Sequence, residues 1–138
     1  MATFVKFPSF AKAVLRGVHN FESHVFKAAL TNTLPATTAA MLADITQVSG
    51  GAYPAGGYTL DGVTLSDAAG VAKVTIADEI IAAAGGAVGA LRYAVVYNDS
   101  AAGKPLVGYV DYGSSITLGD GESLALDFDP DAGVLTLT

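Results

Sequence analysis

Residues 91–138, the last third of the chain, consist of short β-type runs separated by turn residues. The runs are rich in Val, Tyr, Leu and Ile, which favour strands. Between them stand Asn98-Asp99-Ser100, Gly119-Asp120-Gly121 and Asp129-Pro130-Asp131, which are typical of turns. Strands at intervals of about 8–14 residues predict an antiparallel β-sandwich or barrel.

One helix is expected near the start of the chain. Ser9 is a candidate N-cap for a helix over residues 10–18, because Phe10 and Val14 recur at helical spacing and Gly17 stands near its end. Residues 37–44 could form a helical turn. Residues 77–84 are ambiguous, since Asp78 could cap a helix or the preceding strand could continue.

The other elements read as strands and loops. The expected strands cover residues 23–31, 45–48, 58–65, 71–76, 91–98, 105–112, 115–118, 122–128 and 134–138. Residues 49–57, rich in Gly, predict a mobile or contact loop. Residues 106–112 are apolar on both faces, so that strand should be covered on both sides, by its own chain or by a neighbouring subunit.

These elements predict a mainly β fold: an antiparallel β-sandwich or barrel-like domain with one short N-terminal helix. We expect residues 1–8 to form an extended N-terminal arm and residues 9–138 a single β-rich domain.

The charge is low and unevenly spread, which bears on the partners of the chain. Charged residues make up 14%, against about 25% in typical domains. Residues 1–30 carry four basic side chains against Glu22, whereas residues 97–138 carry seven acidic side chains against Lys104. The acidic end argues against direct nucleic-acid binding, which needs a basic surface. The sequence holds no apolar run of about 18 residues, so no membrane partner is expected.

The histidines and the acidic pairs are weak candidates for chemistry. His19, Glu22 and His24 offer metal-binding residue types, but they span a predicted helix-to-strand junction and need not converge. Asp120 and Glu122 could act as paired carboxylates, but they stand in a turn. We expect no metal site, no cofactor and no catalytic residue.

The acidic residues near the end of the chain imitate a calcium loop. Asp127, Asp129 and Asp131 have suitable spacing, but the glycine is at the seventh position, Gly133, and the twelfth position is Thr138. A hairpin turn with solvated carboxylates is the better interpretation. Ser114 and Ser115 likewise lack a nearby histidine in sequence, which disfavours a nucleophile.

Tyrosines gather in two strands that are expected to be adjacent. Tyr93 and Tyr97 stand in one strand, and Tyr109 and Tyr112 in the next. Such a face could stack against sugars. Cross-strand aromatic pairing and burial at a subunit contact are the alternatives.

Several short segments carry a resemblance to a known family. They include Leu-Arg-Tyr-Ala-Val-Val-Tyr-Asn-Asp at residues 91–99. The others are residues 17–20, 27–33 with Pro35, 42–46, 58–60, 105–108, 112–115 and 133–137. In this order the chain resembles a family of small virion structural proteins of tailed bacteriophages, which has no catalytic signature.

The resemblance implies a non-enzymatic role in the virion, with synthesis in the bacterial host cytoplasm. The expected role is a capsid decoration (cement) protein on the capsid surface: a homotrimer that contacts the major capsid protein and bridges capsomers. The alternative is a tail, baseplate or head-to-tail connector component, with glycan binding as one form of it. Residues 2–8 are expected to act as an anchoring arm. The candidate assembly contacts are Phe4, Lys6, Phe7, Tyr53, Tyr58, Tyr93, Tyr97, Tyr109 and Tyr112.

Overall fold

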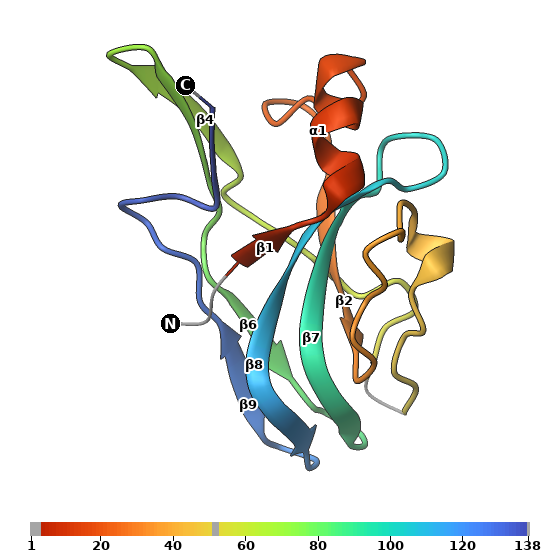
Figure 1. Cartoon of the computed structure of the whole chain (residues 1–138). Helices are drawn as coiled ribbons and strands as arrows, with labels where there is room; N and C mark the ends of the chain where they lie inside the picture. Colours follow the sequence, from red (N-terminus) through yellow and green to blue (C-terminus); the bar gives the residue numbers. More distant parts are fainter. Residues whose placement is uncertain (1–3, 51–52, 138) are drawn as a thin grey trace.

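The computed structural model describes residues 4–50 and 53–137, and this part of the chain is mainly β with one α-helix (Figure 1). The predicted fold class is therefore confirmed, as antiparallel sheets packed in a sandwich-like arrangement. The helices are α1 (Pro8–Leu15) and a 3-10 turn, η1 (Leu42–Asp44). The strands are β1 (Phe4–Lys6), β2 (Phe26–Thr31), β3 (Tyr58–Thr59), β4 (Thr64–Ala68), β5 (Val71–Thr75), β6 (Glu79–Ala82), β7 (Val88–Asn98), β8 (Leu106–Leu118), β9 (Ser123–Leu126) and β10 (Leu135–Leu137).

The central sheet has five antiparallel strands in the order β1-β8-β7-β2-β3. Its long central pair, β7 and β8, aligns Val95 with Tyr109 and Ala94 with Val110. The two expected strands at 105–112 and 115–118 are in fact one strand, β8, which continues through Gly113. Gly113 has φ +87°, which a glycine adopts without the steric cost that other residues incur.

Two smaller sheets cover one face of the central sheet. The order is β10-β5-β4 in one and β6-β9 in the other, and both lie on the same side of β7 and β8 (Figure 1). Alternate residues of the central strands point into this layer, among them Phe26, Leu30, Val96 and Val110. They pack with Ile81 and others from the smaller sheets to form the larger hydrophobic core.

The opposite face of the central sheet is covered by the segment around η1. Ala29, Val95 and Leu106 pack there against Phe7 and Ile45. Residues 106–110 of β8 are thus covered on both sides by their own chain, which decides between the two alternatives for this doubly apolar run, whereas residues 113–115 of the same strand are exposed. Burial of both faces accounts for the continuous apolar pattern of this run.

The helix begins at Pro8, earlier than expected. Phe7 is the extended N-cap residue and Pro8 takes the first helical position, where its fixed φ and missing N–H are tolerated. The expectation that Ser9 caps the helix is wrong, because its hydroxyl instead donates to the carbonyl oxygen of Ala39, 3.3 Å away. This bond ties α1 to the covering segment.

Other differences concern the number and the bounds of the strands. The strand expected over residues 58–65 is in fact two strands, β3 and β4, which belong to different sheets. The strand expected from residue 23 begins at Phe26, after a turn, and residues 45–48 form no strand. The ambiguous segment 77–84 contains β6, a strand, and Asp78 accepts a hydrogen bond from the N–H of Phe128 instead of capping a helix. In the part of the chain that the structure describes, no helix is long and apolar enough to cross a bilayer.

Candidate functional site

The tyrosines of β7 and β8 belong to the interior more than to the surface. Tyr93 and Tyr97 are buried on the face covered by η1, and the Tyr97 hydroxyl donates to the carbonyl oxygen of Gly56. The rings of Tyr93 and Tyr109 meet edge to face at 5.8 Å, and Phe7 packs on Tyr109 at 5.4 Å. The prediction that these strands are adjacent is confirmed, and the pairing is cross-strand aromatic packing.

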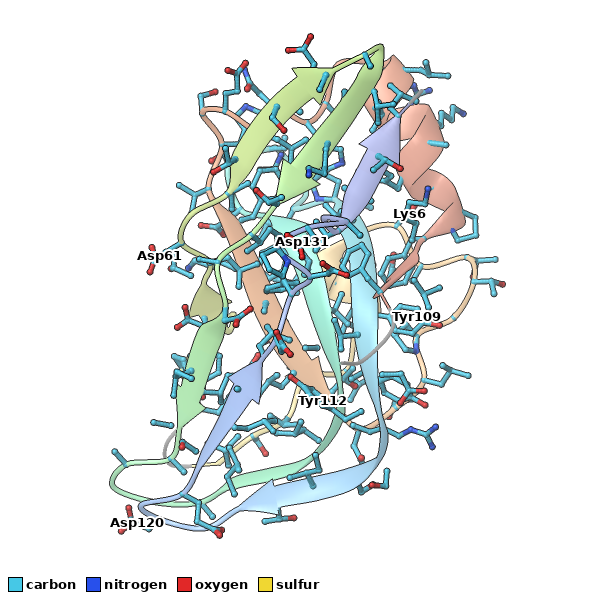
Figure 2. All side chains as sticks on the ribbon, turned by 90° about the vertical axis from the view of Figure 1, so that its left-hand side faces the viewer. Lys6, Asp61, Tyr109, Tyr112, Asp120 and Asp131 are labelled. Atoms are coloured by element: carbon cyan, nitrogen blue, oxygen red, sulfur yellow. The ribbon has the colours of Figure 1, made fainter. Side chains whose placement is uncertain are left out.

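The other candidate tyrosines are half-buried and lie elsewhere. Tyr112 lies on the opposite side of β8 from Tyr109 and packs against the larger core (Figure 2). Burial, and secondarily Asp127, raises the pKa of Tyr112 to about 12. Tyr53 and Tyr58 meet edge to face at 6.1 Å in the loop that leads to β3. The predicted contact tyrosines therefore do not converge on one surface.

The N-terminal residues lie along the edge of the central sheet. Phe4 and Lys6 belong to β1, which pairs with β8, and Phe7 is buried under the η1 segment. Residues 1–3 of the predicted arm lie outside the described residues. Because Phe7 is a core residue, deletion of residues 2–8 would damage the fold as well as remove an arm, so that deletion cannot test anchoring by itself.

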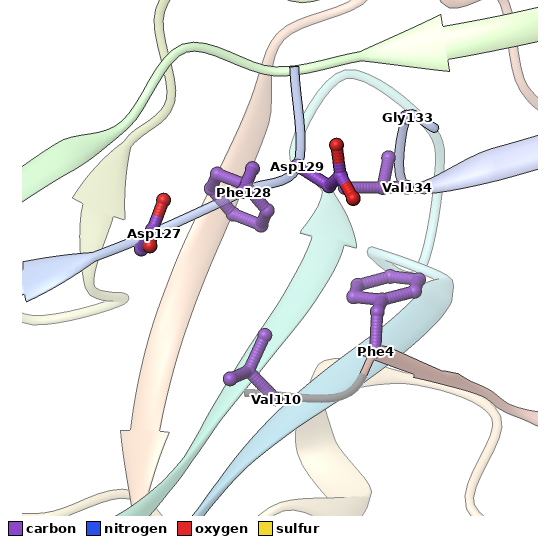
Figure 3. Close-up of a pocket in the computed structure, with 7 residues that line it drawn as sticks. All are labelled: Phe4, Val110, Asp127, Phe128, Asp129, Gly133 and Val134. Carbon is purple, nitrogen blue, oxygen red and sulfur yellow. The ribbon is translucent and has the colours of Figure 1, made fainter. Parts of the chain in front are cut away.

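A small hollow lies between β1 and the segment that follows β9 (Figure 3). It measures about 230 Å³, and the rings of Phe4 and Phe128 face it together with Val110 and Val134. Asp129 stands at its rim, but its Oδ1 accepts the N–H groups of the following turn at 2.9 and 3.0 Å. These bonds lower the pKa of Asp129 and identify it as a turn residue. The expected hairpin is wrong, however, because β9 pairs with β6 and β10 pairs with β5, so this turn connects two different sheets.

The other groups considered for chemistry also have structural partners. Asp120 accepts the N–H of Gly85, and Glu122 accepts the N–H of Gly119, so each carboxylate fastens a turn. The Ser115 hydroxyl donates to the side-chain oxygen of Asn32. Within residues 4–50 and 53–137, no group of three metal-ligating side chains converges.

The two histidines converge on one side chain that the sequence did not single out. The buried amide nitrogen of Asn98 lies 3.1 Å from Nδ1 of His19 and 2.9 Å from Nδ1 of His24. The Asn98 oxygen accepts the N–H groups of Ser100 and Ala101, so its nitrogen must be the donor to both rings. Both imidazoles therefore accept at Nδ1 and carry their proton at Nε2.

This arrangement disfavours a charged His19. Its ring is half-buried among Phe10, Phe21 and Phe26, with centroids 5.3 to 6.1 Å away. Burial, and secondarily His24, lowers the pKa of His19 from 6.5 to about 4. Nε2 of His19 has no hydrogen-bond partner among the described residues. The two histidines thus connect the 19–24 turn to the end of β7 through hydrogen bonds with Asn98. In the sequence, only the short spacing between the two histidines indicated that they could act together.

An apolar groove runs between α1 and the β10-β5-β4 sheet, with a volume of about 610 Å³. Helix α1 contributes Val14 and Leu15, and the sheet contributes Leu65, Val74 and Leu137. Leu15 is 88% exposed and Leu137 66% exposed, which is unusual for leucines on neighbouring elements. The separation of α1 from the β4–β5 hairpin is visible at the top of Figure 1.

The groove is bordered by positive charge. Lys6 lines it, and Lys12 and Arg16 stand on exposed positions of α1 and its C-cap. Sequence reasoning placed Lys6 among the candidate contacts but missed the leucines, because the groove exists only once α1 lies beside β10, more than 100 residues away in the chain.

Comparisons with known proteins add no assignment: no protein-family model, no curated protein and no solved structure matches this chain.

Proposed function

We propose that this protein is a non-enzymatic virion structural protein of a tailed bacteriophage, and that it acts as a capsid decoration protein which bridges neighbouring capsomers. It would act by burying apolar surface against other subunits, with no bond made or broken. The resemblance of residues 91–99 and the other matching segments to small phage virion proteins supports the phage assignment.

The observation that carries an assembly role is the apolar groove. A groove of about 610 Å³ lined by leucines and valines offers little to a polar substrate, whereas apolar patches of this kind characterise protein contacts. The candidate reactive groups support the same view, since His19, His24, Asp129 and Ser115 are engaged in hydrogen bonds that hold turns and strands together.

The arrangement of the tyrosines bears on the alternative role in glycan binding. A sugar-binding platform needs exposed aromatic faces, but Tyr93 and Tyr97 are buried inside the domain. We therefore favour decoration of the head over a glycan-binding tail or baseplate component.

The test is cryo-electron microscopy of particles from the virus that encodes the chain, with and without its gene. A decoration protein gives density on the outside of the shell, and heads without it break at lower temperature or lower ionic strength. Density confined to the tail, baseplate or connector would replace the head role by the alternative. Absence of the protein from mature particles would contradict a virion role altogether.

A further inference from the structure

Two apolar surfaces at opposite ends of the molecule lie near charges of opposite sign. The first is the apolar groove beside α1. The second is the outer face of the β6–β9 strand pair, defined by Ile80, Ala82, Ser123, Ala125 and Asp127, which are all exposed. The two strands pair Ile80 with Ala125 and Ala82 with Ser123, so these side chains share the face that points away from the core.

We propose that a second copy of this chain docks its β6–β9 outer face into the groove, with Ile80 inserted between α1 and β10. This inference rests on the proposed role in assembly and gives it a specific self-contact. Ile80 is 60% exposed and is flanked by small residues, so it stands out as an apolar knob on a flat strand pair. Leu15 and Leu137 are the groove residues positioned to cover it.

The charges favour this pairing over the contact of two grooves. Lys6 lines the groove, and Lys12 and Arg16 are exposed on α1 and its C-cap beside it, whereas Asp67, which shares a face of β4 with Leu65, offsets one of these charges. Two grooves face to face would bring like charges together, which costs free energy at an interface.

The end of the molecule that holds the β6–β9 strand pair is acidic, opposite in charge to the groove end. Residues 76–91 and 105–138 contain no lysine or arginine, and they carry Asp127 on the outer face itself. Asp120 marks this end in Figure 2, far from Lys6 beside α1. A head-to-tail contact therefore places the acidic end of one copy against the basic end of the next.

A contact between two different surfaces is heterologous. After the first contact forms, one copy still has a free groove and the other still has a free β6–β9 outer face. Such contacts close into a ring where the rotation allows it and otherwise extend. The contact therefore predicts a particular behaviour of variants that have lost one surface each.

The experiment uses two single variants of the full chain and sedimentation velocity. Leu15→Glu places an acidic group in the groove, and Ile80→Gln places an uncharged polar side chain on the β6–β9 outer face, so the two altered surfaces do not attract each other. Both positions are exposed, so the urea midpoint of each variant should match that of the wild type. We expect wild-type protein to self-associate and each variant alone to be monomeric, with the dissociation constant raised at least about tenfold.

The mixture of the two variants is the decisive sample. Leu15→Glu keeps an intact β6–β9 outer face and Ile80→Gln keeps an intact groove, so one contact can form and the mixture should stop at a dimer. Leu34→Glu and Leu34→Gln are matched controls, because Leu34 is 61% exposed in the loop after β2, and both should associate like the wild type.

Each other outcome overturns the inference. A monomeric wild type, variants that still associate, an Ile80→Gln protein that is unaffected while Leu15→Glu dissociates, or a mixture that stays monomeric would each exclude this contact. The proposed function is judged separately, by binding of the same proteins to capsids. A chain that decorates capsids as a monomer would overturn the inference alone, whereas a self-associating chain absent from particles would overturn the function alone.

Discussion

Replacement of His19 by glutamine should make the protein more resistant to mild acid. The wild-type ring accepts a hydrogen bond from Asn98 at Nδ1, and protonation of that nitrogen would break the bond and place a charge beside three phenylalanine rings. The glutamine side chain would keep an acceptor oxygen for Asn98 but cannot be charged. The prediction concerns how the free energy of unfolding changes with pH.

The direction follows from the pKa of His19, which is about 4 in the folded protein and 6.5 in the unfolded chain. Between these values the unfolded chain binds more protons, so stability is complete above pH 6.5 and falls as the pH is lowered toward 4. At pH 5 the full pKa shift would lower the free energy of unfolding by about 2 kcal/mol, since one pKa unit equals about 1.36 kcal/mol. The ring is partly open to solvent, so we expect about 1 kcal/mol.

Urea unfolding at pH 7 and pH 5 measures this loss. Between pH 7 and pH 5, the free energy of unfolding of the wild-type protein should fall by about 1 kcal/mol more than that of the His19→Gln variant. Aspartates with lowered pKa, such as Asp99 and Asp111, act only below about pH 4, and Glu79 affects both proteins equally. His24→Gln is the matched control, because it keeps His19 and should keep most of the pH dependence. Equal losses in wild type and His19→Gln would refute the reasoning, as would an NMR titration that shows His19 protonating near pH 6.5.

Three further changes test the packing. Gly57→Ala should prevent folding, because its Cβ would collide with the carbonyl group of Ala28, whereas Gly70→Ala, also at positive φ but in open space, should cost only about 1 kcal/mol in urea unfolding. Tyr97→Phe removes the donor to the 49–57 loop and should lower the free energy of unfolding by about 1 kcal/mol. Arg92→Lys, which loses a bidentate pair across β7 and β8, should leave the urea midpoint almost unchanged because the pair is exposed.

The elements that the sequence predicted well are those whose local pattern and long-range packing agree. Residues 91–98 and 105–112 are rich in β-branched and aromatic residues, and they form the central pair of the fold. Boundaries failed where a tertiary contact overrode a local signal. Ser9 has the side chain of an N-cap, but the carbonyl of Ala39 lies within its reach and Pro8 fits the first helical position better.

The candidate site was predicted less well, because its parts are distant in the chain. Nothing local in residues 8–15 indicates that they lie beside residues 135–137, so the exposed leucines of the groove resemble ordinary apolar positions in sequence. The role of Asn98 was hidden for the same reason, since His19 and His24 precede it by 79 and 74 residues. Burial of tyrosines in the chain's own core and burial between chains leave the same sequence pattern, so the sequence alone could not tell which tyrosines are contacts.

The structure also explains part of the low charge content of the chain. Only 14% of the residues are charged, against about 25% in typical domains. The central sheet accounts for much of the apolar excess, because both of its faces are covered by the chain itself, including the doubly apolar run at residues 106–110 of β8. This burial leaves some large apolar side chains open, among them Leu15, Leu34, Ile80 and Leu137, which are each at least 60% exposed. Leu15 and Leu137 line the groove and Ile80 projects from the β6–β9 outer face, so a contact between copies would cover these three with a single surface pair.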